Sequence, residues 1–256
     1  MTQKGQEMRK IAVTITKGGV GKTTTAVNLA AGLAIAGKRV LLIDTDTQGQ
    51  AAICLGVDPL HNLADVMMGG VPIEQATIEA RPNLFLLAGG QNLAQLKTHI
   101  TLKDMRREYA LADALQGFDN NFDFVIIDSG PGYDILSINI LVYAGEILAP
   151  VNTEVLSVQS LGQFIQNVKD VRSNGHDVKI KYIVPTFYDK RVKKTDEVVE
   201  TLIAHFGDLV CDPIRYNVKL SEAPAFKQTI FEFDQYAPGA FDYVKLVKRI
   251  ISNGTK

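Results

Sequence analysis

The sequence predicts one α/β domain whose mostly parallel, twisted sheet is covered by helices on both faces. Short apolar runs rich in β-branched residues alternate with longer helical patterns along the chain, as in βαβ units. The runs are continuously apolar, which is typical of parallel strands buried on both faces. No internal repeat or Pro-rich linker interrupts the pattern. We therefore expect a single domain over residues 10–256, after a flexible N-terminus over residues 1–9.

The strands are predicted from runs of β-branched and other apolar residues. The first run, KIAVTIT, leads directly into a glycine-rich loop, and the second, RVLLID, ends on a carboxylate. The region 56–81 contains Gly and Met, is irregular, and is expected to form a surface excursion between strands. The predicted strands span residues 10–16, 39–44, 84–88, 122–128, 146–151 and 178–186.

Helical patterns lie between these strands. The first is rich in Ala and Leu and ends before Gly37, a residue type that suits the end of a helix. The last is amphipathic, with Val244 and Val247 on one side and Lys245 and Lys248 on another. The predicted helices span residues 23–36, 91–116, 136–143, 155–174, 192–206 and 240–251.

The composition is that of an ordinary globular protein. Hydrophobic residues make up 46% and charged residues 21%, which allows a sizeable core. The net charge is −1, so any binding to nucleic acid must come from a local patch. Cys54 and Cys211 lie far apart without CxxC or Cys/His spacing, which argues against a zinc site and a disulfide framework. Lacking a signal-peptide pattern and an apolar run of about 18 residues, the chain is expected to be cytoplasmic.

The glycine-rich loop after the first predicted strand is the main functional motif. The general P-loop pattern is G-x-x-x-x-G-K-[ST]; here Thr16 replaces the first glycine and an extra lysine follows it. Glycines allow successive N–H groups to point at phosphate oxygens, and the next helix directs its positive end to the same place. The predicted ATP-binding residues of this loop are Lys17, Gly18, Gly19, Val20, Gly21, Lys22, Thr23 and Thr24.

Acidic residues at the ends of two predicted strands complete the expected Mg-ATP site. Asp128 closes the strand FVIID, as a Walker B aspartate does, and would bind the cofactor there. In a parallel sheet the carboxyl ends of the strands form the ligand-binding edge. Asp44 and Asp46 follow the second strand, and both could face the phosphates if that strand continues to Asp46. A cap or turn role for Asp44 is the alternative.

Together these motifs resemble the ParA/Soj group of partition ATPases, in the wider MinD/ParA class of deviant Walker A P-loop NTPases. The stretch 17–51 is similar to the opening of that family, 128–141 to its Walker B segment, and 217–224 to its N-V-R-L-S-E-A-P motif. The resemblance covers nearly the whole chain. It implies a P-loop ATPase fold and weak ATP hydrolysis that a partner stimulates.

The resemblance also assigns roles to individual residues. Lys17 matches the signature lysine, which crosses a dimer interface to the partner's nucleotide. Thr24 would help hold the α-phosphate, and Asp46 would position the hydrolytic water. The implied catalytic residues are Lys17, Lys22 and Asp46, and the implied Mg²⁺ ligands are Thr23, Asp46 and Asp128.

Partners follow from the same resemblance: a second copy of the chain in the presence of ATP, DNA of any sequence, and a ParB-like adaptor, with the protein on the nucleoid. A local basis for DNA binding is the cationic run over 190–194, although a solvated basic loop would look the same. The family's I-P-R-N is replaced here by Ile-Arg-Tyr-Asn over 214–217, which alters the local adenine contacts. The candidate DNA-binding residues are Lys190, Arg191, Lys193, Lys194, Arg215 and Lys219.

Three alternatives stay open. The amphipathic last helix could act as the membrane anchor of a MinD-like switch, although packing on the sheet is the preferred interpretation and a membrane partner is not expected. The cargo could be a protein assembly instead of a plasmid or chromosome. A metabolic enzyme of the same superfamily, such as a nitrogenase-reductase-like or amidotransferase-type protein, is the third alternative. The nitrogenase-reductase-like form is disfavoured because Cys54 and Cys211 lack the spacing of cluster cysteines.

Overall fold

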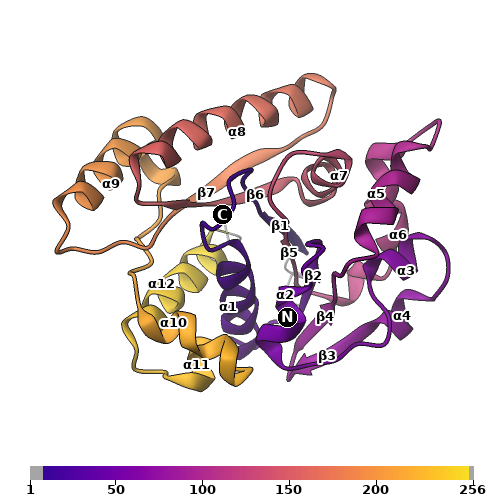
Figure 1. The fold of residues 1–256 in the computed structure, drawn as a ribbon, viewed down its shortest axis with the longest axis horizontal. Coiled ribbons are helices and arrows are strands. Elements are labelled where there is room, and N and C mark those ends of the chain that lie inside the picture. Colours follow the sequence, from indigo (N-terminus) through magenta and orange to yellow (C-terminus); the bar gives the residue numbers. More distant parts are fainter. Residues whose placement is uncertain (1–7, 254–256) are drawn as a thin grey trace, which may run out of the picture.

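A seven-stranded sheet forms the centre of the molecule, with helices packed on both of its faces (Figure 1). The computed structural model describes residues 8–253. The strand order is β3-β4-β2-β5-β1-β6-β7, and all neighbours pair in parallel except β3 and β4, which are antiparallel. The predicted fold class is confirmed. The strands are β1 (Arg9–Val13), β2 (Val40–Asp44), β3 (Thr77–Arg81), β4 (Leu84–Leu87), β5 (Phe124–Asp128), β6 (Glu146–Asn152) and β7 (Lys179–Thr186).

The helices fill the connections between the strands. The α-helices are α1 (Lys22–Ile35), α2 (Gln50–Leu55), α3 (Leu63–Met67), α4 (Ile73–Ala76), α5 (Leu93–Thr101), α6 (Ala110–Leu115), α7 (Ile135–Ala144), α8 (Val155–Ser173), α9 (Lys193–Phe206), α10 (Val218–Glu222), α11 (Ile230–Phe233) and α12 (Pro238–Ser252). Short 3-10 turns are η1 (Arg107–Tyr109), η2 (Asp119–Asn121), η3 (Gly207–Leu209) and η4 (Ala223–Phe226).

Alternate strand residues pack on opposite faces of the sheet. Ile11 and Leu42 belong to a core that includes α1 and α12, whereas Ala12 and Leu41 belong to a core on the other face that includes α5 and α7. A third cluster fills the space between α8, α9 and the strands β6 and β7. Because helices cover both faces, every residue of β2 and β5 is buried, which explains the continuously apolar runs.

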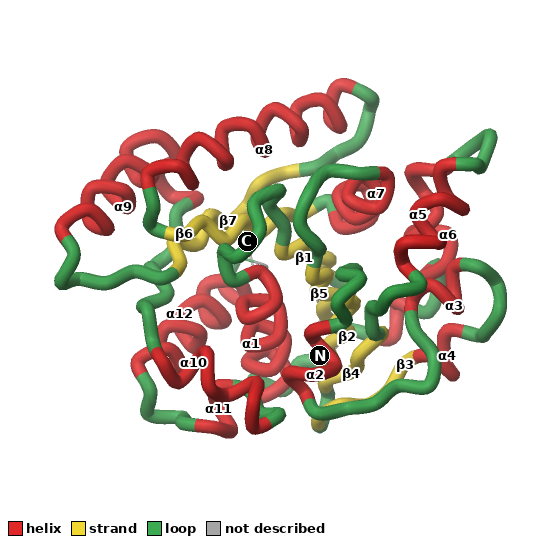
Figure 2. The backbone as a smooth tube through the Cα atoms, in the orientation of Figure 1, coloured by secondary structure: helices red, strands yellow, loops and turns green. Residues whose placement is uncertain are grey.

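The sheet order places β1 between β5 and β6. The loop that joins β1 to α1 therefore starts at the centre of the sheet, at its carboxyl edge, and lies near the middle of the molecule (Figure 2). Asp44 and Asp128 are direct register partners at the same edge. The topology thus brings the glycine-rich loop and both strand-terminal carboxylates together.

The predicted helix 91–116 is wrong as a single element. It consists of α5, the turn η1 and α6, with a break after Thr101. Residues 101–107 are all exposed, so no apolar stripe holds this segment against the core, and Arg106 adopts a left-handed backbone with φ 54°. Amphipathic helices in proteins depend on such packing.

The region 56–81 is more ordered than expected. It contains α3, capped by a reciprocal Asn62–Asp65 box, then α4 and the edge strand β3. A strand of only five residues beside β4 gives little local signal, which is why the sequence did not reveal it. The first strand was also misplaced, because β1 begins at Arg9 and leaves the sheet after Val13, where the chain turns into the loop.

The predicted flexible N-terminus falls largely on residues 1–7, which lie outside the described residues. Arg9 itself is fixed: its guanidinium donates to Glu146 at 2.5 Å and to the hydroxyl of Tyr182 at 2.8 Å. It also donates to the carbonyl of Ile250 in α12. These contacts tie the first strand to β6, β7 and the last helix.

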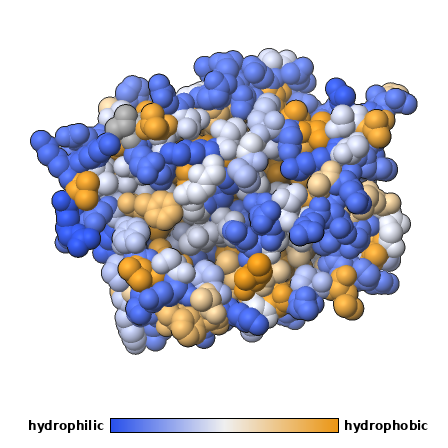
Figure 3. All heavy atoms as spheres, viewed as in Figure 1, coloured by the Kyte–Doolittle hydropathy of each residue, from blue (hydrophilic) through white to orange (hydrophobic). Residues whose placement is uncertain are grey.

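The last helix packs on the core through its apolar face. Tyr243, Leu246, Val247 and Ile250 of α12 are buried in the cluster that contains α1. Within residues 8–253, no helix is long and apolar enough to cross a membrane. In the face seen in Figure 3, hydrophilic side chains cover α8 and α9, while apolar ones gather at the corner formed by α10 and α11.

The close packing of α1 on α12 gives a prediction. A Cβ atom added to Gly32 would lie 2.7 Å from Cγ2 of Val247, so Gly32→Ala should lower the free energy of unfolding by roughly 1–2 kcal/mol despite the better helix propensity of Ala. Gly162 in α8 has no neighbour within 4 Å of such an atom; Gly162→Ala should raise stability by about 0.5–1 kcal/mol. Urea denaturation of both variants measures the contrast, and equal shifts would contradict it.

Candidate nucleotide-binding site

The loop from β1 to α1 has the geometry of an anion site. Gly19 and Gly21 have φ values of 69° and 85°, a left-handed backbone that favours glycine. Gly21 is the N-cap of α1, and no side chain caps the helix. The first N–H groups of α1 are therefore free to bind a ligand, and the positive end of the helix dipole lies beside them.

Lys22 begins α1 and is almost buried, with 7% of its surface exposed. Its Nζ donates to the carbonyl of Lys17 at 2.8 Å. Burial lowers the pKa of Lys22, while the charges of Asp128 and Asp46 act in the opposite direction. The ammonium thus lies between the loop and the carboxylates, as required of a lysine that contacts phosphate.

Asp128 is fully buried at the end of β5, and neither of its carboxylate oxygens has a hydrogen-bond partner among residues 8–253. Burial raises its pKa well above the usual value, and the charge of Asp44 adds to this effect. The nearby Thr23 hydroxyl and the charge of Lys22 act in the opposite direction. A buried carboxylate without a partner calls for a cation, so Asp128 and Thr23 fit a Mg²⁺ ion beside a phosphate chain.

Asp44 shapes the loop that follows it. Its carboxylate accepts the N–H of Asp46 at 2.8 Å and the N–H of Ala51 at 3.0 Å. Burial raises the pKa of Asp44 to about 6, against the effect of these two hydrogen bonds. The turn role considered for Asp44 is the one that the structure supports.

Asp46 lies in a turn after β2 and not on a continuation of that strand. Strand β2 ends at Asp44, so the two carboxylates are not alternate residues of one strand, because Asp44 folds the chain into a turn there. Asp46 is half-buried, and its Oδ1 accepts the N–H of Gln48 at 3.1 Å. Its side chain nevertheless lines the same cleft as the glycine-rich loop.

The cleft has a volume of about 390 Å³. Most of the predicted ATP-binding residues meet there, since its lining includes Gly18, Gly19, Gly21, Lys22, Thr23 and Thr24. Val20 does not contribute its side chain, which is buried in the core below, but its carbonyl accepts the hydroxyl of Thr186 at 2.9 Å. Asp128 is buried behind the lining, close enough for its charge to act on Lys22.

Lys17 does not line the cleft, and its side chain binds within its own chain. Its Nζ donates to Ser157 at 2.8 Å, to Glu154 at 3.1 Å and to Asn152 at 3.3 Å. The hydrogen bond from Lys17 lowers the pKa of Glu154. These partners come from the end of β6 and the start of α8, so Lys17 is held at the rim of the site.

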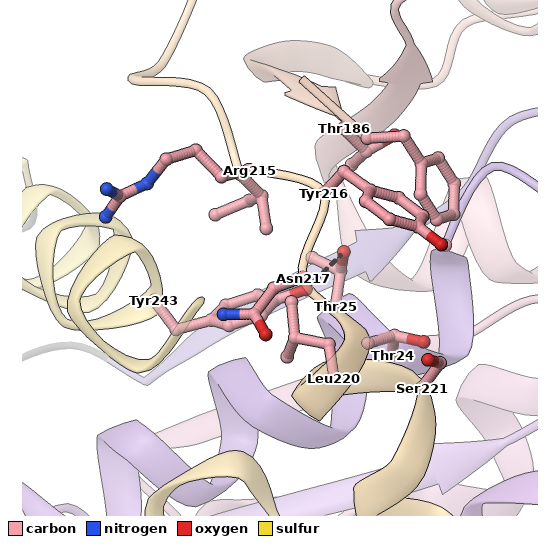
Figure 4. A pocket seen from close by; sticks show the side chains of 12 residues that line it. Thr24, Thr25, Thr186, Arg215, Tyr216, Asn217, Leu220, Ser221 and Tyr243 are labelled. Carbon is pink, nitrogen blue, oxygen red and sulfur yellow. Dashed lines mark hydrogen bonds between the residues drawn. The ribbon is translucent and has the colours of Figure 1, made fainter. Parts of the chain in front are cut away.

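A second pocket of about 130 Å³ continues from the cleft, because Gly21, Thr24 and Phe187 line both (Figure 4). The sequence did not identify its other lining residues beyond the altered stretch 214–217. The lining comes from β7, α1, the segment 214–217, α10 and α12, and it includes Ile214, Tyr216, Asn217, Leu220 and Tyr243.

The cationic candidates fall into two groups. Lys190, Arg191, Lys193 and Lys194 are all exposed at the start of α9, although Arg191 pairs with Asp189 at 2.7 Å. The two remaining candidates are separately engaged, since Arg215 pairs with buried Asp242 at 2.7 Å and Lys219 pairs with Glu222 at 3.2 Å.

Comparisons with known proteins agree with this geometry. A protein-family model described as an AAA domain matches residues 8–181. The chain is 35% identical over 253 residues to the chromosome partitioning protein ParA of Caulobacter vibrioides (strain NA1000 / CB15N), covering 96% of this chain and 94% of that protein. It is also 35% identical over 253 residues to the sporulation initiation inhibitor protein Soj of Bacillus subtilis (strain 168), covering 95% and 98%.

Among solved structures, the chain resembles cobyrinic acid a,c-diamide synthase from Mycobacterium smegmatis with bound ADP and magnesium. The TM-score is 0.83 at 30% identity, and the match covers 97% of this chain and 96% of that one. A magnesium nucleotide is thus bound by a protein of the same fold and similar sequence.

The buried carboxylates give a prediction for the nucleotide-free protein. Folding raises the pKa of Asp44 to about 6. Protonated Asp44 therefore contributes its full stabilisation of the folded state below its unfolded pKa of about 4. This contribution is lost as the pH rises through 6, where the buried group becomes charged. Asp128→Asn removes the buried carboxylate beside Asp44, and with it the repulsion between the two charges. The substitution should therefore raise the free energy of unfolding by about 1–2 kcal/mol at pH 7.5. The gain should shrink at pH 4.5.

Asp134→Asn is the matched control for urea denaturation in the presence of a chelator. Although burial acts in the opposite direction, hydrogen bonds from Lys97 and Ser137 lower the pKa of Asp134, so its charge stabilises the fold at neutral pH. This substitution should therefore lower stability at pH 7.5. A loss of stability for Asp128→Asn at that pH would contradict our interpretation of the pair.

Proposed function

Since this chain belongs to the ParA/Soj family of ATPases, we propose that it forms ATP-dependent dimers, binds DNA without sequence preference and segregates a DNA cargo with a ParB-like adaptor. One observation supports the proposal above all. An uncapped helix N-terminus and a buried lysine meet at one cleft at the carboxyl edge of the sheet. Behind its lining lies the buried carboxylate of Asp128, which has no hydrogen-bond partner among residues 8–253. This combination suits a magnesium triphosphate.

The triphosphate would lie across the N-terminus of α1. Lys22 would release the carbonyl of Lys17 and bind the β and γ phosphates, and Thr24 would bind the α-phosphate. Thr23 and Asp128 would hold Mg²⁺, which when bound neutralises charge on the phosphates. The base would enter the second pocket, which continues from the cleft at Thr24.

Asp46 is the proposed positioning group for the attacking water. Its Oδ1 accepts the N–H of Gln48, whereas Oδ2 accepts no hydrogen bond from residues 8–253 and could accept one from water. Asp44 fixes the backbone of Asp46 through the hydrogen bond at 2.8 Å. Water orientation by a fixed side chain is the usual contribution of the protein in this kind of phosphoryl transfer.

Dimerisation would require Lys17 to change partners. In the single chain its ammonium is bound by Glu154, Asn152 and Ser157. A γ-phosphate on a facing copy offers more negative charge than the one carboxylate, so ATP would favour the exchange and ADP would not. Leu156 and Phe187, which are large and exposed near this rim, would become covered in the dimer.

DNA binding would come from the exposed run at the start of α9. Each protomer offers Lys190, Lys193 and Lys194, and dimerisation would double this patch and raise the avidity. The adaptor would stimulate hydrolysis, dissolve the dimer and release the DNA. In this scheme the adaptor would select the cargo, which would be a chromosome, a plasmid or a protein assembly.

Two other hypotheses, a membrane anchor at α12 and an amidotransferase activity, have less support. A membrane anchor at α12 would have to expose Tyr243 and Leu246, which are buried in the core. A glutamine-dependent amide transfer on this chain would need a reactive thiolate, whereas burial raises the pKa of both Cys54 and Cys211 to about 11.

Lys17→Gln tests the cross-subunit role. The variant should bind Mg-ATP as a monomer within about threefold of the unaltered protein, because Lys17 does not line the cleft of its own chain, and it should form no ATP-dependent dimers. Calorimetry and light scattering with ATP and with ADP measure the two properties.

Glu154→Gln is the contrasting variant, because it weakens the intramolecular hold on Lys17 without removing the lysine. It should form dimers at lower ATP concentration than the unaltered protein. Dimers of normal stability in Lys17→Gln would exclude the exchange mechanism.

Lys190→Glu combined with Lys193→Glu tests the DNA patch. Affinity for a random-sequence duplex in the presence of ATP should fall about tenfold or more, with a shallower dependence on salt. Lys194 is left unchanged because its charge acts on Glu154, next to Lys17. Lys103→Glu combined with Arg107→Glu, at exposed positions between α5 and the start of η1, is the control of equal charge change. An equal loss of affinity there would show that net charge, not this patch, binds DNA.

A further inference from the structure

The second pocket is open to the phosphate cleft and has an aromatic side. Gly21, Thr24 and Phe187 line both cavities. Figure 4 shows Tyr216 on one side of the pocket and Leu220, Thr24 and Ser221 on the other. A flat ring that enters from Thr24 would lie between these sides.

Two aromatic side chains on this side are exposed and have no ring partner. Phe187 is 44% and Tyr216 59% exposed, and within residues 8–253 neither makes a ring–ring or cation–ring contact. Large exposed aromatic rings beside a pocket often mark a ligand site.

The backbone holds both rings in place. The segments that carry Phe187 and Tyr216 run parallel and are joined by two backbone hydrogen bonds. The N–H of Tyr188 donates to the carbonyl of Ile214 at 3.1 Å, and the N–H of Tyr216 donates to the carbonyl of Tyr188 at 2.8 Å. Arg215 anchors its segment to α12 through Asp242, which accepts the backbone N–H at 3.0 Å and the guanidinium at 2.7 Å. The residue before Tyr216 is thereby anchored to α12, the helix that also supplies Tyr243 to the pocket.

Phe187 is held in a strained conformation. Its φ is 54°, in the left-handed region that a bulky residue rarely adopts. The Thr153 hydroxyl donates to its carbonyl at 3.1 Å, and the ring lies 3.7 Å from the position of a Cβ on Gly21. Strain of this kind is typically retained where a side chain serves a ligand.

Polar groups that could recognise the edge of a base are partly engaged. Oδ1 of Asn217 accepts the N–H of Lys219 at 2.9 Å, and the hydroxyl of Thr25 is bonded to that of Tyr243 at 3.2 Å. The lining therefore favours contact with the face of a ring over hydrogen bonds to its edge.

We propose that Phe187 and Tyr216 form an aromatic roof that stacks on the base of a purine nucleotide, with Leu220 opposite them. The inference rests on the proposed ATP site and assigns its base affinity to two side chains: Phe187, which no motif indicated, and Tyr216, which lies in the altered stretch 214–217. The roof acts on the base alone, so it should matter for ATP and not for inorganic tripolyphosphate.

The experiment is calorimetric titration with Mg-ATP and with Mg-tripolyphosphate. Tyr216→Ala and Phe187→Ala should each weaken ATP binding by about tenfold, the usual effect of losing one stacked ring, and leave tripolyphosphate binding within about twofold. Tyr216→Phe should keep the affinity for ATP. Tyr236→Ala, which removes a 76% exposed ring outside the pocket, should change neither affinity.

Two further measurements keep the outcome clear. The ratio of ATP to CTP affinity should fall in both alanine variants, because a purine offers the larger face for stacking, and this ratio does not depend on measurable tripolyphosphate binding. Urea denaturation midpoints show whether the variants are folded. Unchanged ATP affinity in both variants, or an equal loss for tripolyphosphate, would overturn the roof. Failure of the unaltered protein to bind ATP would instead overturn the proposed function.

Discussion

The site depends on a buried carboxylate that has no hydrogen-bond partner among residues 8–253. Asp128 ends β5 in full burial, directly beside Asp44 in the register of the sheet. Burial and the charge of Asp44 disfavour the ionised form of Asp128, and the positive charge of Lys22 offsets part of this effect. A site prepared in this way is costly when empty and is relieved when a cation and phosphate arrive. Ligand affinity and lower intrinsic stability therefore have the same physical origin.

The loop after Asp128 contacts both the start of the glycine-rich loop and the helices α7 and α5. Gly132 donates its N–H to the carbonyl of Thr16 at 3.0 Å, so the loop is bonded to the residue that precedes the phosphate loop. Two residues later Asp134 caps α7 and pairs with Lys97 of α5 at 2.7 Å. These contacts join the glycine-rich loop to α7 and α5, which pack on the face of the sheet opposite to α1.

Local motifs and long-range contacts contributed to different parts of the site. The loop with Gly19 and Gly21 lies between a strand and a helix, as predicted, because strand, glycines and helix are consecutive and each acts on its neighbours. The second strand was predicted to end at Asp44, and its continuation to Asp46 was left open; the structure ends β2 at Asp44 and places Asp46 in the turn made by Asp44. Arg215 was grouped with the basic run on charge alone, whereas the fold pairs it with buried Asp242 of α12, a residue distant in the sequence.

The sequence by itself determined the α/β class, the parallel strands and the phosphate loop, because these follow from periodicity and from backbone conformations that a few adjacent residues dictate. Tertiary structure decided the break in the helix predicted over 91–116, the edge strand β3 and the aromatic side of the second pocket. These depend on burial and on contacts between distant segments, such as those that bring Phe187 beside Gly21. Such contacts have no local periodicity, so only the folded chain defines them.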